Sequence, residues 1–138
     1  MTRIVLDTNV LVAAAYAAVS ASRRIVDACI DGQLTAVASA AVKREYEFIL
    51  GRAVRKPGYQ DRLAVLLQRL ELAKPVETPR IVPEDPDDDK FLAAAVAGNA
   101  EWLITNDRHL LELDPYREIR IVPSGVFADT ALARPAEH

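Results

Sequence analysis

The sequence has little of what marks a secreted or membrane-spanning protein. Its 138 residues include one cysteine, Cys29, so an internal disulfide is impossible and nothing points to an oxidising compartment. The N-terminus lacks the basic region, long apolar stretch and cleavage site of a signal peptide. No apolar run approaches the roughly 20 residues that span a bilayer. We therefore expect a cytoplasmic protein in which Cys29 fills an apolar core.

Several motifs of known chemistry are also absent. The chain has no Walker loop, no GxGxxG and no GxSxG, so neither nucleotide-cofactor chemistry nor a serine nucleophile elbow is supported. The formal net charge of −3 argues against a general nucleic-acid coat protein, which would be basic overall. It does not exclude a nuclease, because a cluster of metal-binding carboxylates can mask basic patches elsewhere.

What is present is a regular alternation of strand and helix patterns in a chain of single-domain length. Runs that predict strands lie at 3–6, 34–38, 74–77, 102–105 and 119–122. Patterns that predict helices lie at about 10–18, 20–31, 39–50, 59–72, 88–97 and 107–113, with a last helix after 124. This alternation predicts an α/β fold with a parallel sheet covered on both faces.

The helix boundaries are predicted from capping residues. Ser20 or Ser22 and then Ser39 are expected to cap helices, which Gly32 and Gly51 are expected to end. A basic loop is predicted over 52–58. In the helix after it, leucines recur with helical spacing and predict a packing face; they are Leu63, Leu66, Leu67 and Leu70.

Three aspartates lie where a strand ends or a helix begins. Asp7 closes the first strand, Asp89 ends the acidic run 85–89, and Asp107 follows the fourth strand. Taken singly, each is also typical of a helix cap or a turn.

Glu45 is harder to explain as a surface residue. It lies three residues after Val42 on an apolar helical stripe that continues through Tyr46 and Ile49. A carboxylate on an inward face needs a cation or hydrogen-bond donors. Glu45 therefore indicates either a metal ligand or an internal salt bridge.

The expected topology brings these acids together. In doubly wound sheets, ligands bind beyond the carboxyl ends of the strands, where the strand order reverses. With the order 3-2-1-4-5 the first and fourth strands are neighbours, so Asp7 and Asp107 would meet there. Carboxylates this close raise their own pKa values unless a cation neutralises them. An oxygen-only cluster selects Mg²⁺ or Mn²⁺ over zinc.

The chain resembles the PIN domain over nearly its whole length, in particular the VapC-like branch of toxin components from toxin–antitoxin pairs. The resemblance rests on residues 4–12 (Ile-Val-Leu-Asp-Thr-Asn-Val-Leu-Val), Glu45, residues 85–95 and residues 103–107, and residues 119–127 resemble the closing strand and turn. It implies a single domain over 1–138. It also implies a three-layer α/β/α fold whose central parallel sheet has the strand order 3-2-1-4-5.

The resemblance also implies the site. The residues expected to bind metal and act in catalysis are Asp7, Glu45, Asp89 and Asp107. The residues expected to support and orient the site are Asn9, Thr105 and Asn106. Asp87 and Asp88 make the third acidic position ambiguous, and Asp89 is preferred because it directly precedes Lys90 and the helix.

The implied function is that of a metal-dependent endoribonuclease using Mg²⁺ or Mn²⁺. Hydrolysis would leave a 5′-phosphate and a 3′-hydroxyl, without a covalent enzyme intermediate. The enzyme would be a homodimeric toxin held in check by an antitoxin protein. The basic residues expected to contact RNA phosphates are Lys43, Arg44, Arg52, Arg55 and Lys56. A solvated helix face explains these basic residues equally well.

Two other classes of protein fit part of the pattern. A phosphatase of the haloacid-dehalogenase type also begins with an apolar strand ending in Asp. It needs a second Asp two positions later, where this chain has Asn9. The other alternative is a non-catalytic binding module whose carboxylates only cap helices.

Overall fold

The structure is a computed structural model that describes residues 1–75 and 89–132, with Asp89 described by its backbone alone. Five strands pair in parallel in the order β3-β2-β1-β4-β5, which confirms the predicted sheet. The strands are β1 (Arg3–Leu6), β2 (Thr35–Ala38), β3 (Glu71–Leu72), β4 (Trp102–Ile104) and β5 (Arg120–Val122).

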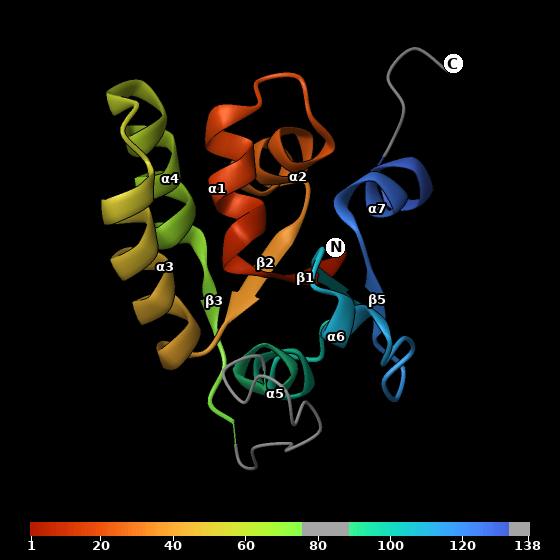
Figure 1. Cartoon of the computed structure of the whole chain (residues 1–138). Helices are drawn as coiled ribbons and strands as arrows, with labels where there is room; N and C mark the ends of the chain where they lie inside the picture. Colours follow the sequence, from red (N-terminus) through yellow and green to blue (C-terminus); the bar gives the residue numbers. More distant parts are fainter. Residues whose placement is uncertain (76–88, 133–138) are drawn as a thin grey trace.

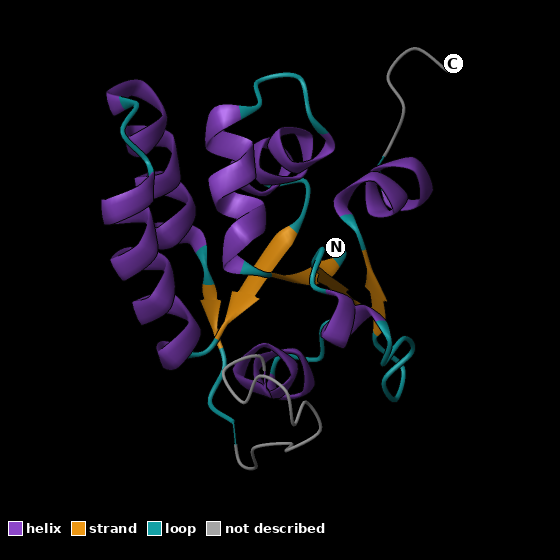
Figure 2. Ribbon diagram, viewed as in Figure 1, coloured by secondary structure: helices purple, strands orange, loops and turns teal. Residues whose placement is uncertain are grey.

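Helices cover both faces of this sheet. They are α1 (Thr8–Tyr16), α2 (Ala21–Ile30), α3 (Ala40–Ala53), α4 (Pro57–Arg69), α5 (Asp89–Ala97), α6 (Arg108–Leu111) and α7 (Ser124–Ala131). Figure 1 shows α1, α2 and α7 on one side of the sheet and α5 on the other, with α3 and α4 side by side near the β3 edge. Figure 2 shows the same three layers by secondary structure. No helix in the described part is long and apolar enough to span a membrane.

The central strand is buried on both faces, as parallel strands between two helical layers are. Ile4, Val5 and Leu6 are at most 1% exposed. The predicted leucine face of α4 packs inward through Leu63 and Leu66. Cys29 is also buried, which confirms its place in the core, and burial raises the pKa of its thiol to about 12.

The predicted serine caps are confirmed. Ser20 accepts a hydrogen bond from the backbone N–H of Arg23 at the start of α2, and Ser39 accepts one from that of Val42 at the start of α3. Each cap satisfies a backbone donor that the first turn of a helix leaves free. Gly32 follows α2 with a φ of 84°, a conformation that glycine adopts without strain.

The third strand lies earlier than predicted. The helix expected over 59–72 ends at Arg69, and Glu71 and Leu72 pair with Val37 and Ala38 of β2. An edge strand of two residues is too short to show the alternation of apolar and polar residues that marks a strand. The leucine pattern that ends at Leu70 therefore predicts that the helix continues through Glu71 and Leu72. Lys74 lies in the loop after β3, and 76–77, the other end of the predicted strand, lie outside the described residues.

The predicted stop at Gly51 is also wrong. Helix α3 continues through Gly51 to Ala53, and the buried Val54 follows as its C-cap. Burial of Leu50 and Val54 on one face offsets the cost of about 1 kcal/mol for glycine inside a helix. The basic loop is correspondingly shorter than 52–58, because α3 includes Arg52 and α4 begins at Pro57.

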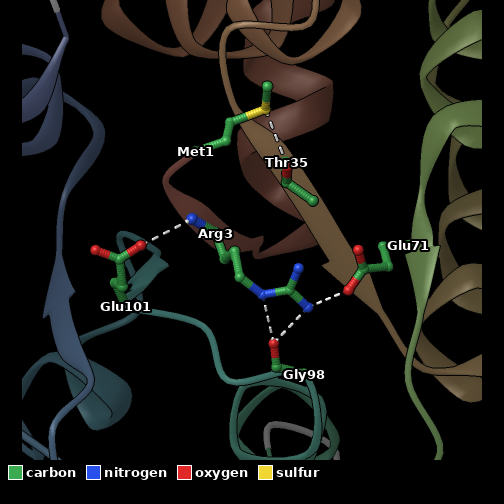
Figure 3. A network of polar contacts seen from close by, with 6 residues as sticks. All are labelled: Met1, Arg3, Thr35, Glu71, Gly98 and Glu101. Carbon is green, nitrogen blue, oxygen red and sulfur yellow. Dashed lines mark hydrogen bonds and ion pairs between the residues drawn. The ribbon is translucent and has the colours of Figure 1, made fainter.

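Arg3 ties three elements together at the amino end of the sheet. Figure 3 shows its guanidinium donating to the carbonyl oxygen of Gly98, through Nε at 2.8 Å and Nη2 at 2.6 Å, and pairing with Glu71 of β3. The Arg3 backbone N–H also donates to Oε1 of Glu101 at 3.1 Å. One side chain thus joins β1, the edge strand and the C-terminal end of α5.

Candidate active site

Asp7 lies where β1 ends and α1 begins, at the carboxyl edge of the sheet. Its backbone N–H donates to the carbonyl oxygen of Ile104 at 2.9 Å, which continues the β1–β4 pairing. Its side chain is 5% exposed and accepts two hydrogen bonds, from Thr105 Oγ1 at 2.6 Å and from the Asn9 backbone N–H at 3.3 Å. The carboxylate is therefore fixed in position by the residue that follows β4 and by the first turn of α1.

Thr105 connects Asp7 to Asp107. The fully buried Thr105 hydroxyl donates to Asp7 and accepts from the backbone N–H of Asp107 at 2.9 Å. The Asp107 carboxylate in turn caps α6 by accepting from the His109 backbone N–H at 2.8 Å. Asp7 and Asp107 therefore meet beyond β1 and β4, as the strand order requires.

Glu45 reaches the same edge from α3 and is half-buried. Its Oε2 accepts a hydrogen bond from the Thr8 hydroxyl, and its Oε1 forms an ion pair with Lys90 Nζ of α5 at 2.5 Å. The internal salt bridge that the sequence left open is thus present. It places a positive charge among the carboxylates.

Burial and neighbouring charge act on Asp7 together. Burial raises the pKa of its carboxyl, the charges of Asp107 and Glu45 raise it further, and the hydrogen bonds from Thr105 and Asn9 offset part of the effect. The charges of Asp7 and Glu45 also act on Tyr46, whose hydroxyl donates to the Leu6 carbonyl at 2.5 Å. Burial, and then the charge of Asp7, raise the pKa of this phenol. The site is a region of crowded negative charge.

This crowding predicts how the stability of the metal-free protein depends on pH. Because the folded-state pKa of Asp7 is raised, the folded protein retains a proton that the unfolded chain releases above an ordinary Asp pKa of about 3.9. The free energy of unfolding, relative to that of Asp7→Asn, should therefore fall as pH rises through this window and level off above the folded-state pKa. Urea unfolding in EDTA at a series of pH values measures it. A wild-type-to-variant difference that is constant with pH would contradict the prediction.

The donor set fits a hard divalent cation in its chemistry. Asp7, Glu45 and Asp107 offer only oxygen, which suits Mg²⁺ and Mn²⁺. Among the residues whose side chains are described, no three His, Cys, Asp or Glu groups already form a metal cage. Asp89 begins α5, but its side chain lies outside the described part, as do Asp87 and Asp88. A cation at Glu45 would have to compete with Lys90.

The other predicted residues lie at different depths. Asn9 and Asn106 are both exposed, and Asn9 reaches Asp7 through its backbone N–H. Among the predicted basic residues, Lys43 is half-buried and the others are exposed, namely Arg44, Arg52, Arg55 and Lys56. All five belong to α3 or to the segment that links it to α4.

Sequence reasoning missed two residues of the site. Thr8 and Lys90 are the direct partners of Glu45, and they come from α1 and α5. Both stand next to a predicted metal ligand in the sequence, Thr8 after Asp7 and Lys90 after Asp89. That adjacency is the only signal in the sequence, and it does not reveal a contact with a third helix.

Comparison with known proteins places this site in a family. The model of the PIN domain family matches residues 3–109, so the chain belongs to the PIN domain family. PIN domains are generally nucleases, and this supports the assignment of the chain as a hydrolase. No curated protein matches the chain.

Solved structures share the fold. One is the crystal structure of VapBC2 from Rickettsia felis bound to a DNA fragment from the VapBC2 promoter. It has 19% sequence identity to this chain and a TM-score of 0.57, and the match covers 87% of this chain and 97% of the other. Another is PAE2754 from Pyrobaculum aerophilum, with 17% identity, a TM-score of 0.58, and coverage of 93% and 88%. At these identities the likeness concerns the fold alone.

Proposed function

We propose that the protein is a metal-dependent endoribonuclease that hydrolyses RNA phosphodiester bonds. The observation that carries the proposal is the convergence of Asp7, Glu45 and Asp107 at the carboxyl edge of the sheet, with Asp7 buried against its like-charged neighbours. Crowding and burying negative charge lowers the free energy of unfolding. Such a cluster therefore indicates a bound cation or a catalytic role. Membership of a family of nucleases supports the same assignment.

The residues that would hold Mg²⁺ or Mn²⁺ are Asp7, Glu45, Asp89 and Asp107. Such an ion supplies activation of water and stabilisation of the charge that builds on a phosphodiester. The chain itself contributes orientation: Thr105 fixes the Asp7 carboxylate, and Thr8 fixes that of Glu45. Lys90, which pairs with Glu45, keeps a positive charge at the site that would meet the phosphate of a bound RNA.

The biological role we propose is that of a toxin restrained by an antitoxin in the cytoplasm. The support is the fold shared with VapBC2, a toxin–antitoxin complex, together with VapC-like segments around Asp7, Glu45 and Asp107. A homodimer is part of the same proposal. Growth arrest on expression, relieved by Asp7→Asn and by co-expression of an antitoxin, would support this role.

The first test is cleavage of a mixed single-stranded RNA by the purified protein, with Mn²⁺ or Mg²⁺ and with EDTA. We expect cutting only with metal, and products that carry 5′-phosphate and 3′-hydroxyl ends. If no metal supports cutting and calorimetry detects no Mn²⁺ binding, the proposal fails and a binding module is favoured. Hydrolysis of a phosphate monoester without RNA cleavage would instead favour a phosphatase.

A further inference from the structure

An exposed aromatic residue lies on the same side of α3 as the site carboxylate. Phe48 follows Glu45 by three residues and precedes Arg52 by four, so all three share one side of the helix. Phe48 is 58% exposed, although the Arg52 guanidinium lies over one face of its ring, 4.4 Å from the centroid. An apolar ring kept in water beside a cation has no evident role in the core.

A second aromatic residue with a cation lies nearby, at the end of α1. Tyr16 is 47% exposed. Its hydroxyl donates to the Ala53 carbonyl at 2.5 Å and accepts from the Arg55 backbone N–H at 2.9 Å. The Lys56 ammonium lies 5.2 Å from its ring centroid. These contacts fix Tyr16 against the C-terminal end of α3.

The two helices therefore form one face that leads to the site. Figure 1 shows α1 beside α3. Thr8 and Glu45 join the helices at the carboxylate end, and Tyr16 and Ala53 join them at the other end. From Glu45 to Arg52 is seven residues, or about 10 Å along the axis. That length suits a few nucleotides of a strand whose successive phosphates lie about 3.4 Å apart along a stacked helix.

We propose that this α1–α3 face, defined by Tyr16, Phe48, Arg52 and Lys56, binds single-stranded RNA beside the cleavage site; the inference rests on the proposed nuclease function. An unpaired base stacks on the free face of Phe48, and the cations of Arg52 and Lys56 contact phosphates. Proteins that hold single strands combine a basic groove with aromatic platforms in this way. A duplex does not fit, because its bases are already stacked on one another.

The distribution of charge favours RNA over a protein as the occupant. Within α3, which the structure describes throughout, the acidic residue other than Glu45 is Glu47, and it lies on the opposite side. Glu47 lines a cavity of about 280 Å³ between α3 and α4, with an apolar wall that includes Leu50, Val54 and Leu63. The α1–α3 face instead presents cations beside its exposed rings, which complements an anionic strand.

The test is fluorescence anisotropy of a labelled single-stranded RNA of mixed sequence, measured in EDTA so that nothing is cut. Phe48→Ala and Phe48→Leu should each weaken binding about tenfold, whereas Phe48→Trp should retain it, because stacking needs an aromatic face. Val126→Ala on α7 is the matched control, since Val126 is also an exposed apolar side chain, and it should bind like the wild type. A duplex of the same sequence should bind more weakly than the single strand.

Salt dependence separates the two roles within the face. Arg52→Gln should reduce the slope of log affinity against log salt by about 0.7, the value for one phosphate contact on a single strand. Phe48→Ala should weaken binding and leave that slope unchanged. Arg24→Gln, at an exposed position on α2, is the charge control and should change neither quantity.

Three results would overturn the inference. They are unchanged RNA affinity in Phe48→Ala, equal affinity of the wild type for duplex and single strand, and no binding of RNA by the wild type. If Phe48→Ala changes the oligomeric state in sedimentation and spares RNA binding, the face is a protein interface instead. These binding results are independent of the cleavage assay. The nuclease proposal fails if the wild type shows no metal-dependent cutting, and that outcome is distinguishable from failure of the RNA-binding inference.

Discussion

Asp7→Asn should lower the kcat/KM of metal-dependent RNA cleavage by at least about a hundredfold, the order lost when a group that stabilises transition-state charge is removed. An amide is a weak ligand for a hard cation, so the variant loses a charge at the centre of the site. It keeps the shape of the side chain, and its amide oxygen can still accept from the Asn9 backbone N–H or the Thr105 hydroxyl. The effect should therefore be on chemistry and metal binding, with the fold preserved.

Stability distinguishes this outcome from simple misfolding. Because Asp7 is buried beside Asp107 and Glu45, removing its charge should raise the melting temperature of the metal-free protein at neutral pH, by about 2–5 °C. Asp61→Asn, at an exposed position on α4, is the matched control and should alter neither activity nor melting temperature. Full cleavage by Asp7→Asn would remove Asp7 from the catalytic machinery.

Gly98→Ala should destabilise the protein by about 3 kcal/mol, a large part of the stability of a small domain. A Cβ at Gly98 would lie 2.1 Å from Val37 Cγ1 and 3.2 Å from the Ala94 carbonyl oxygen. Val37 is fully buried in β2, so it has no free space into which to move. Either β2 or the end of α5 has to shift, and the contact of Arg3 with the Gly98 carbonyl is strained as well.

Denaturant unfolding measures this effect against a matched glycine. Gly51 lies inside α3, and a Cβ added there would meet nothing within 4 Å, so Gly51→Ala should be neutral or stabilising by up to about 1 kcal/mol. Adding Val37→Ala to Gly98→Ala should cost less than the sum of the two single changes, because the first removes the atom that the second meets. Additive losses would show that the clash is not the cause.

The sequence predicted those parts of the fold that have a strong local pattern. Four of the five strands and their parallel arrangement follow from apolar runs separated by capped helices, whereas the strand order was implied by the resemblance to the PIN domain. The exception, β3, is held by pairing with β2 and by Arg3, which are contacts from distant segments that no local pattern records. The stop at Gly51 failed for a related reason, since burial of Leu50 and Val54 outweighs the weak preference of one residue.

The candidate site divides in the same way. Asp7 and Asp107 could be brought together from sequence because both follow neighbouring strands, and parallel strands end at one edge. The partners of Glu45 could not, because Thr8 and Lys90 meet it only through the packing of α1 and α5 against α3. Phe48 was missed because its meaning depends on exposure and on the Arg52 guanidinium beside it, neither of which the sequence states.

The position of β1 at the centre of the sheet has a consequence for synthesis. Among the strands of this sheet β1 is synthesised before the others. It pairs with β2 on one side, but on the other side with β4, which begins about 100 residues later at Trp102. Asp7 gains its Thr105 partner only then, and Asp107 follows. A partly made chain therefore carries no assembled carboxylate site, so the activity we propose is withheld from nascent chains until most of the domain has emerged.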